Sequence, residues 1–232
     1  GTGYDPHGEI SLSDRAVLAE ERPLLQEVAR VAILCNDSSL EQKDGEWLVH
    51  GDPMEGALLV AGLKAGLDLE LEAKQYPRTD LIPFESEHRF MATLHHDHSC
   101  DTFIFLKGAP EKILEMCTYQ RSLNNDQPLD KNYWLERIEE LAGYGQRVLA
   151  LAFKPANHKQ EELGFNDLEN DLVMLGMVGL IDPPREEAIE AVDICKQAGI
   201  RVKMITGDHG ATARAIAQQL KLVNTDDVLT GT

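Results

Sequence analysis

Long apolar runs, paired cysteines and a surplus of basic residues are all missing from this chain. No stretch approaches the roughly 20 apolar residues that cross a bilayer, and no signal peptide opens the sequence. We therefore expect a chain that does not itself insert into a membrane.

The cysteines are Cys35, Cys100, Cys117 and Cys195, and none forms a C-x-x-C pair. This spacing argues against a disulfide framework or a zinc site, and scattered thiols are typical of a reducing compartment.

Basic residues are scarce relative to acidic ones. The chain has 22 Lys and Arg against 40 Asp and Glu, which gives a formal net charge of -18. Such a chain repels phosphate backbones and anionic lipid surfaces at long range, so nucleic acid is not an expected partner. A bound anion such as ATP would need a local cluster of basic side chains set against this field.

Length and composition are those of a folded protein. The 232 residues, 43% apolar and 27% charged, suffice for one large domain and part of a second. Apolar spacing predicts a helix over 24–34, and Asp52 and Pro53 suit the N-cap and first residue of a helix that ends near Gly66. Three β-prone runs between 78 and 107 predict an antiparallel meander.

Further elements are predicted up to residue 180. They are an entry without helix over 1–13, a strand over 47–49, a helix from Pro110 to about Cys117, a loop over 120–131, a helix over 133–144, a surface insertion over 155–171 and strands over 147–153 and 172–180. This mixture of helices with a largely antiparallel sheet predicts an α+β domain.

The pattern changes at Asp182-Pro183-Pro184, where two prolines impose an extended segment. Helices predicted over 188–198 and 211–220 then flank a predicted strand over 200–205, an αβα run typical of a parallel sheet. We therefore expect an α+β domain over residues 1–181 and part of an α/β domain over residues 182–232.

Two turns carry polar groups at positions where ligands bind in many proteins. Lys107 and Gly108 lie between a predicted strand and the start of a helix, and Thr206-Gly207-Asp208 follows the strand predicted over 200–205. On spacing alone, an exposed strand-to-helix turn is the favoured explanation for Lys107, and a helix cap fits Thr206 or Asp208. The common phosphate-loop fingerprints are absent.

Two other short motifs have ordinary explanations. Asn36-Asp37-Ser38 matches a glycosylation sequon, but a match this short is favoured as chance. The run His95-His96-Asp97-His98 suggests a metal site, yet it falls between two predicted strands without a second cluster of ligands, so the tip of a hairpin is favoured.

Six motifs in register carry a family resemblance. They are GDPMEGALL (51–59), PFESEHRFM (83–91), LKGAPE (106–111), GQRVLALA (145–152), GLIDPPR (179–185) and MITGD (204–208). In this order they resemble the P-type cation-transporting ATPases, most closely the calcium-pump-like branch. The resemblance implies a nucleotide-binding domain with an antiparallel sheet flanked by helices, followed by a partial α/β phosphorylation domain of the haloacid-dehalogenase type.

The resemblance also implies roles for single residues in the first domain. Phe84 matches the aromatic residue that stacks on adenine, and Glu55 matches the acid at the adenine edge. Lys107, followed by Gly108, lines the adenine pocket, whereas Arg89 and Arg147 match basic residues near the phosphates. These three basic residues would supply the positive cluster that an anion needs. Ser86 departs from the pattern, because calcium-pump relatives often have an arginine there.

The remaining implied site residues belong to the phosphorylation domain. Thr206 and Asp208 match residues that support phosphoryl transfer, and Asp182, Arg185 and Gly207 match residues around the nucleotide and the domain joint. The motif DKTGT, with the acceptor aspartate, and the motif GDGxND, which binds magnesium, are absent from these 232 residues. We therefore expect a piece of a longer pump that binds ATP weakly without hydrolysing it, with the Mg²⁺ ligands outside this chain.

Other functions remain open at this point. A phosphohydrolase of the haloacid-dehalogenase class would need a D-x-D-like nucleophile on a strand, which is not evident. An interaction module without a ligand would leave Phe84 and Lys107 with structural roles only.

The resemblance implies a cytoplasmic-facing domain of a bacterial inner or plasma membrane pump, partnered by the actuator, phosphorylation and membrane domains of the same protein. The pattern from Thr206 to Ala213 looks calcium-pump-like, but the ion ligands lie outside this chain.

Overall fold

The computed structural model describes residues 3–12, 15–16, 22–123, 125–181, 184–206 and 210–225. The chain forms two compact units, each containing two segments of sequence. Unit 1 consists of the described parts of residues 1–130 and 149–178, and unit 2 of the described parts of residues 131–148 and 179–232. The compact units reflect contacts within the structure, whereas the expected domains rest on sequence pattern and family resemblance. The predicted division at residue 182 therefore stays a prediction.

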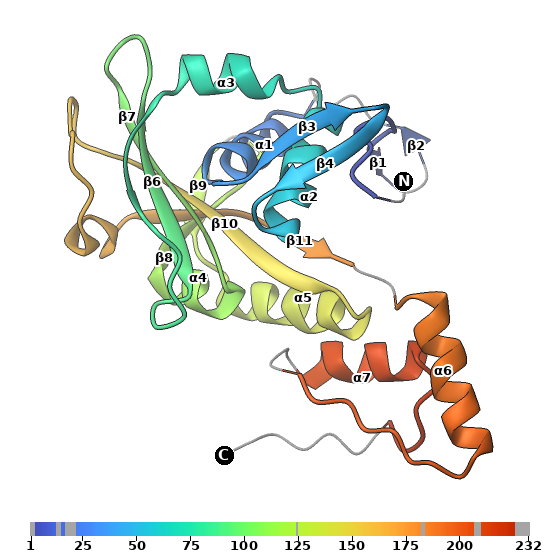
Figure 1. Cartoon of the computed structure of the whole chain (residues 1–232). Helices are drawn as coiled ribbons and strands as arrows, with labels where there is room; N and C mark the ends of the chain where they lie inside the picture. Colours follow the sequence, from blue (N-terminus) through green and yellow to red (C-terminus); the bar gives the residue numbers. More distant parts are fainter. Residues whose placement is uncertain are drawn as a thin grey trace. The chain divides into compact units, whose positions relative to one another are not determined.

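A seven-stranded sheet forms the centre of unit 1 (Figure 1). Its order is β5-β6-β7-β10-β11-β8-β9. The strands are β5 (Arg78–Ile82), β6 (Phe90–His96), β7 (Thr102–Gly108), β8 (Cys117–Arg121), β9 (Asp126–Pro128), β10 (Arg147–Pro155) and β11 (Leu172–Leu180). The first residues of β10 and the last of β11 belong to unit 2. The strands β5, β6, β7 and β10 pair antiparallel, whereas β8 and β11 pair parallel, so the sheet is mixed.

The middle of this sheet is buried on both faces. Side chains alternate between the two faces of a strand, and Phe105 and Leu106, which are neighbours in β7, are both buried. Nearly every residue of β6 and β7 is buried as well. This explains why their sequences read as almost continuous apolar runs.

Two of the helices and one of the hairpins that precede the sheet in sequence pack together. Helix α1 (Pro23–Leu34) packs against β7 and against α2 (Pro53–Lys64), and α2 also contacts the antiparallel hairpin of β3 (Ser39–Lys43) and β4 (Glu46–His50). The remaining elements of unit 1 are β1 (Ser11–Leu12), β2 (Arg15–Ala16), α3 (Leu69–Gln75), α4 (Pro110–Met116) and the 3-10 helix η2 (Phe165–Leu168).

Most predicted elements of unit 1 are present, including both early helices, the meander and the long strands. The loop predicted over 120–131 was wrong in part, because β8 and β9 pair antiparallel there across a short turn. Pairing of β8 with β11 and of β9 with β8 gives this polar segment a strand conformation that its composition does not indicate.

The described part of unit 2 contains three helices: α5 (Lys131–Gly143), α6 (Glu186–Gln197) and α7 (Gly210–Gln219). Helix α5 packs against α7. The strand predicted over 200–205 was wrong, because residues 201–206 adopt no regular structure. A strand is stabilised by hydrogen bonds to a neighbour, and among the described residues no strand pairs with this segment. The α/β arrangement expected after residue 182 is therefore not seen.

Over the residues that the structure describes, no helix has both the length and the apolar character required to cross a membrane.

Candidate nucleotide-binding site

An ion pair between two elements distant in sequence lies at the centre of the candidate site. Glu55 is in the first turn of α2, and Lys107 is the penultimate residue of β7. Lys107 Nζ lies 2.6 Å from Glu55 Oε1, and the two side chains are only 7% and 17% exposed. The structure therefore brings together two of the residues predicted to surround the adenine.

The motif GDPMEG at 51–56 explains how Glu55 is held. The Asp52 carboxylate caps α2 by accepting hydrogen bonds from the backbone N–H groups of Met54 and Glu55, at 2.8 and 3.3 Å. Pro53 is the first helical residue, as predicted. A Cβ at Gly56 would lie 2.4 Å from Val49 Cγ2, so glycine allows α2 to pack closely against β4. Cap and packing together fix the helix turn that carries Glu55.

A turn that sequence reasoning passed over completes the surroundings of Glu55. The Asp37 N–H and the Ser38 hydroxyl both donate to Glu55 Oε2, at 3.1 Å each. The Asn36 amide donates to the carbonyl oxygens of Ala32 and Glu55, at 3.1 and 3.0 Å. Asn36 is buried with its amide engaged, which supports chance as the origin of the sequon. The only sequence signal was a polar run directly after an apolar helix.

Two predicted residues are linked through backbone atoms at the end of the sheet. The Ala109 N–H donates to the Arg89 carbonyl oxygen at 3.0 Å. A Cβ at Gly108 would lie 2.7 Å from that oxygen and 2.6 Å from Phe90 Cβ, so the close approach of β6 requires glycine here. Arg89 is exposed and has a positive φ of 59°. Any contact of Gly108 or Arg89 with a nucleotide stays a prediction.

Phe84 lies in the connection between β5 and β6 and is 60% exposed. This connection is held by its own hydrogen bonds. The Arg89 N–H donates to the Glu85 carbonyl at 2.8 Å, and His88 Nε2 lies 2.9 Å from the Pro83 carbonyl oxygen. A large aromatic ring on an ordered connection offers a face on which a flat ring can stack.

The other predicted residues belong to unit 2 or lie outside the described part of the chain. Arg147 is the exposed first residue of β10, Arg185 is the exposed residue before α6, and Thr206 is exposed. Asp182, Gly207 and Asp208 lie outside the described residues.

The histidine run forms the end of a hairpin, as predicted. Asp97 accepts hydrogen bonds from the N–H groups of Ser99 and Asp101 at 2.8 and 3.0 Å, which closes the β6–β7 turn. His95 is buried in β6, and its Nδ1 lies 2.8 Å from the Tyr76 carbonyl oxygen. Burial lowers the pKa of His95 to about 4. Across the described ranges, no group of three or more His, Cys, Asp or Glu is arranged to hold a metal ion.

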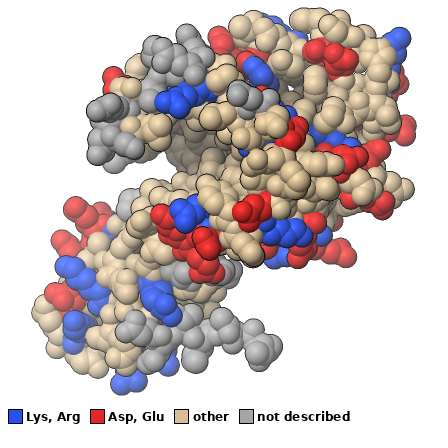
Figure 2. All heavy atoms as spheres, turned by 180° about the vertical axis from the view of Figure 1, so that it is seen from behind, with Lys and Arg blue, Asp and Glu red and all other residues tan. Residues whose placement is uncertain are grey.

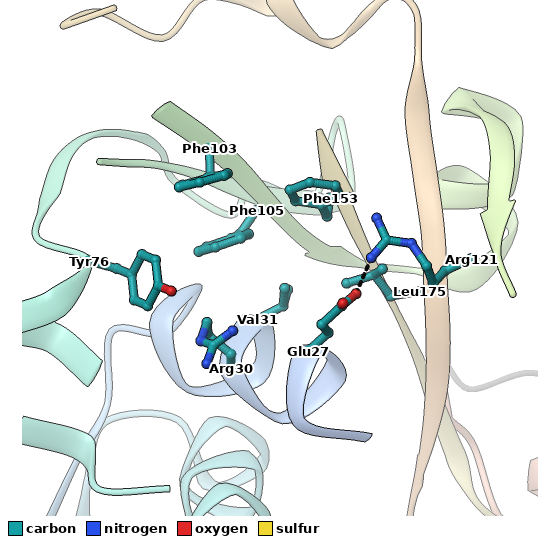
Figure 3. Close-up of a pocket in the computed structure, with 9 residues that line it drawn as sticks. All are labelled: Glu27, Arg30, Val31, Tyr76, Phe103, Phe105, Arg121, Phe153 and Leu175. Carbon is teal, nitrogen blue, oxygen red and sulfur yellow. Dashed lines mark hydrogen bonds and ion pairs between the residues drawn. The ribbon is translucent and has the colours of Figure 1, made fainter. Parts of the chain in front are cut away.

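A separate pocket of about 200 Å³ lies between α1 and the sheet (Figure 3). Its walls are mostly aromatic and aliphatic, with three charged residues at the edge. The lining consists of Glu27, Arg30, Val31, Tyr76, Phe103, Phe105, Arg121, Phe153 and Leu175. Neither Glu55 nor Lys107 contributes to it.

The cations at the edge of this pocket already have partners. The Arg30 guanidinium lies 5.0 Å from the centre of the Tyr76 ring, and its Nε donates to Glu72 at 2.7 Å. The Arg121 guanidinium lies 5.3 Å from the centre of the Phe153 ring and pairs with Glu27 and Asp126. The Arg30 contacts join α1 to α3 and its C-cap residue Tyr76, and the contact between Arg121 and Glu27 joins α1 to the sheet, so we assign the pocket a structural role.

Acidic and basic side chains are intermixed on the face of the molecule shown in Figure 2. The chain as a whole is acidic, with a formal net charge of -18. Binding of an anion would therefore need basic side chains close to it.

Comparison with known proteins identifies the family. A family model described as "P-type ATPase, cytoplasmic domain N" matches residues 24–187. The chain is 43% identical to "Cation-transporting ATPase pma1" of Synechocystis sp., over 98% of the chain and 26% of that protein. It is 35% identical to "Calcium-transporting ATPase" of Bacillus subtilis, over 96% of the chain and 25% of that protein. It is 36% identical to "Probable cation-transporting ATPase F" of Mycobacterium bovis, over 100% of the chain and 26% of that protein.

The chain thus spans about a quarter of the length of these relatives. The family model covers most of unit 1 and reaches the start of α6. Because the family model and the similar proteins both identify this family, the chain belongs to the P-type ATPases and carries their cytoplasmic domain N.

Proposed function

We propose that this chain binds ATP at the end of the sheet where Lys107 and Glu55 meet. The observation that carries the proposal is their ion pair of 2.6 Å, which is shielded from solvent and belongs to two of the family motifs. A buried charged pair is costly to maintain for stability alone. Its position at the end of β7, near the exposed connection that carries Phe84, favours a role in binding.

The residues present suit the parts of ATP. The exposed ring of Phe84 offers a stacking face for the adenine. Glu55 offers an acceptor and Lys107 a donor beside the base. Arg89 is an exposed guanidinium group that can bind phosphate oxygens in a bidentate manner. For Arg147, which belongs to unit 2, contact with the nucleotide stays a prediction from the family resemblance. These basic side chains would offset the repulsion between the acidic chain and the nucleotide.

We further propose that the chain works within a longer pump. Residues 1–181 would form its nucleotide-binding domain and residues 182–232 part of a haloacid-dehalogenase-like phosphorylation domain, both facing the cytoplasm of a bacterial cell. Asp182, Arg185, Thr206, Gly207 and Asp208 would support transfer of the phosphoryl group to an aspartate elsewhere in the protein. The magnesium ligands would also lie elsewhere, in agreement with the motifs that this sequence lacks.

The proposed cargo is a cation of the calcium type. The support comes from the names of relatives, which include calcium-transporting ATPases of Bacillus subtilis and Lactococcus lactis at 35% and 38% identity. Phosphorylation of the aspartate would drive the transport step in the other domains of the pump.

Titration of the chain with ATP by calorimetry tests the binding site. We expect saturable binding that Phe84→Ala and Lys107→Ala each weaken by about tenfold, since stacking and a charged contact each contribute on the order of 1–3 kcal/mol. Lys74→Ala and Tyr144→Ala are matched controls, because both side chains are exposed and lie outside the candidate site. We also expect no release of inorganic phosphate from ATP.

Absence of saturable binding, or binding that is indifferent to both substitutions, would contradict the proposal and favour an interaction module. Phosphate release at the rate of an intact pump would instead favour a complete phosphohydrolase.

A further inference from the structure

Among the described residues, three hydrogen-bond donors contact the Glu55 carboxylate. Lys107 Nζ contacts Oε1, whereas the Asp37 N–H and the Ser38 hydroxyl contact Oε2. The Ser38 Oγ also lies 3.3 Å from the Asp52 carbonyl oxygen, so its single proton has two acceptors within reach, of which the charged Glu55 carboxylate is the nearer. Donors on both oxygens hold the plane of the carboxylate in one orientation.

The turn that supplies two of these donors is itself held in place. Asn36 Oδ1 accepts a hydrogen bond from the Ser38 N–H at 2.9 Å, while the Asn36 amide nitrogen binds the backbone of both α1 and α2. Arg78 of β5 pairs with the Asp37 carboxylate at 2.7 Å. The Ser38 hydroxyl is therefore presented to Glu55 from a fixed support.

Gly51 makes room for that hydroxyl. A Cβ at Gly51 would lie 2.3 Å from Ser38 Oγ and 3.0 Å from Ser38 Cα. Gly51 also has a φ of +119°, which other residues rarely adopt. Both space and backbone conformation at this position accommodate the contact between Ser38 and Glu55.

We propose, resting on the nucleotide site proposed above, that Ser38 is a positioning residue that gives this site its preference for a 6-amino purine. A carboxylate fixed toward the 6-position accepts a hydrogen bond from an amino group and opposes the lone pairs of an oxo group. A carboxylate free to rotate could turn toward the N1–H of an oxopurine and bind it instead. Together with the Asp37 N–H, which contacts the same oxygen, Ser38 holds Oε2 and so keeps the carboxylate from turning toward an oxopurine.

Calorimetry with ATP and ITP on the complete chain tests the proposal, because the two nucleotides carry the same phosphates and differ at the 6-position. We expect the unmodified chain to prefer ATP. Ser38→Ala is expected to reduce the ratio of the two Kd values by about three- to tenfold, the effect of one ordinary hydrogen bond. Ser39→Ala, at the exposed neighbouring residue, is expected to leave the ratio unchanged.

Ser38→Cys provides a second test, since a thiol is a weak donor in a side chain of similar shape. It is expected to reduce the ratio in the same direction, and thermal unfolding of each variant establishes that it is folded. Equal weakening of ATP and ITP, or an unchanged ratio in the folded Ser38 variants, would overturn the positioning role. Equal binding of both nucleotides by the unmodified chain would overturn it too. Failure of the unmodified chain to bind either nucleotide would instead refute the proposed function.

Discussion

Unit 1 buries its apolar side chains far more completely than unit 2. In unit 1, the centres of β6, β7 and β10 are closed on both faces, and Leu94, Leu106 and Leu151 are fully buried. In unit 2, α6 has no buried residue, Ile194 is 66% exposed and Ile205 is 97% exposed. The two units therefore differ in how much of their structure depends on removing apolar surface from water.

This difference shows which helices and strands can be predicted from a sequence. In unit 1, the pattern of apolar residues and the pairing of strands agree, and the predicted strands are present. In unit 2, helices form from local preferences, but the apolar run at 200–205 has no strand to pair with among the described residues. An apolar run is necessary for a buried strand, but the neighbouring strand is equally necessary.

The largest expected effect comes from truncating one apolar side chain in each unit. Leu106→Ala in β7 should lower the free energy of unfolding by about 3 kcal/mol, through lost burial and the cavity that remains. Ile205→Ala should change it by less than about 0.5 kcal/mol, because the side chain is already in water. Urea unfolding followed by tryptophan fluorescence measures both values.

The two tryptophans allow the units to be followed separately, since Trp47 lies in β4 of unit 1 and Trp134 in α5 of unit 2. A Trp134→Phe background reports on unit 1 alone. Similar losses for the two variants would show that the contrast in burial does not extend to stability.

The second expected effect is a loss of stability of unit 1 at acidic pH. His95 Nδ1–H donates to the Tyr76 carbonyl, and Nε2 is buried without a hydrogen-bond partner among the described residues. Protonation of Nε2 would bury a charge, so burial lowers the pKa of His95 from 6.5 to about 4. The unfolded chain then binds more protons between these values. The contribution of neutral His95 to the free energy of unfolding is therefore complete above pH 6.5. It is lost as pH falls toward 4, by up to about 3 kcal/mol.

Thermal unfolding between pH 7 and pH 4.5 measures this loss in the unmodified chain and in His95→Gln. The substitution should flatten the pH dependence, whereas His98→Gln, at an exposed position of the same hairpin, should preserve it. An identical pH profile in His95→Gln would show that other groups cause the acid sensitivity.

The smallest expected effect is the difference in stability between two variants, each of which replaces one arginine by alanine. Arg121 in unit 1 contacts Glu27, Asp126 and the Phe153 ring, so Arg121→Ala should cost about 1–3 kcal/mol. Although burial alone would lower the pKa of the Arg121 guanidinium, the hydrogen bond to Asp126 and the charge of Glu27 raise it overall. Arg137 in unit 2 pairs with Glu140 one helical turn away, and both side chains are 43% exposed. Arg137→Ala should cost about 0.5 kcal/mol or less.

The same urea experiment compares the two variants. Arg137 also contacts an aromatic ring, since its guanidinium lies 5.6 Å from the centre of the Tyr133 ring. Equal costs would therefore indicate that the deeper burial of Arg121 and its second carboxylate partner add nothing to stability.

Sequence reasoning found the parts of the fold that depend on local chemistry. The cap at Asp52, the first helical residue Pro53 and the meander over 78–107 follow from side-chain preferences within a few residues. The strands β8 and β9 and the helix α3 were missed. The polar strand β8 takes its conformation partly from β11, which is distant in the chain, whereas α3 carries a local signal, the N-cap Asp68, that was not recognised.

The candidate site shows the same limit. The family motifs indicated Glu55 and Lys107, and the structure pairs them. Ser38 was not indicated, because its relation to Glu55 depends on how a turn after α1 meets the start of α2. Gly108 was explained only in part, since its closest neighbours are backbone atoms of β6 rather than a ligand.

The ion pair between Lys107 and Glu55 has one more consequence, for the thermodynamics of binding. Long charged side chains lose rotamer freedom when they are fixed, and this loss opposes association when it happens during binding. Here both side chains are already immobilised by each other in the chain without a ligand. A ligand that enters between them therefore exchanges one set of ordered contacts for another, and the entropic penalty has been incurred during folding.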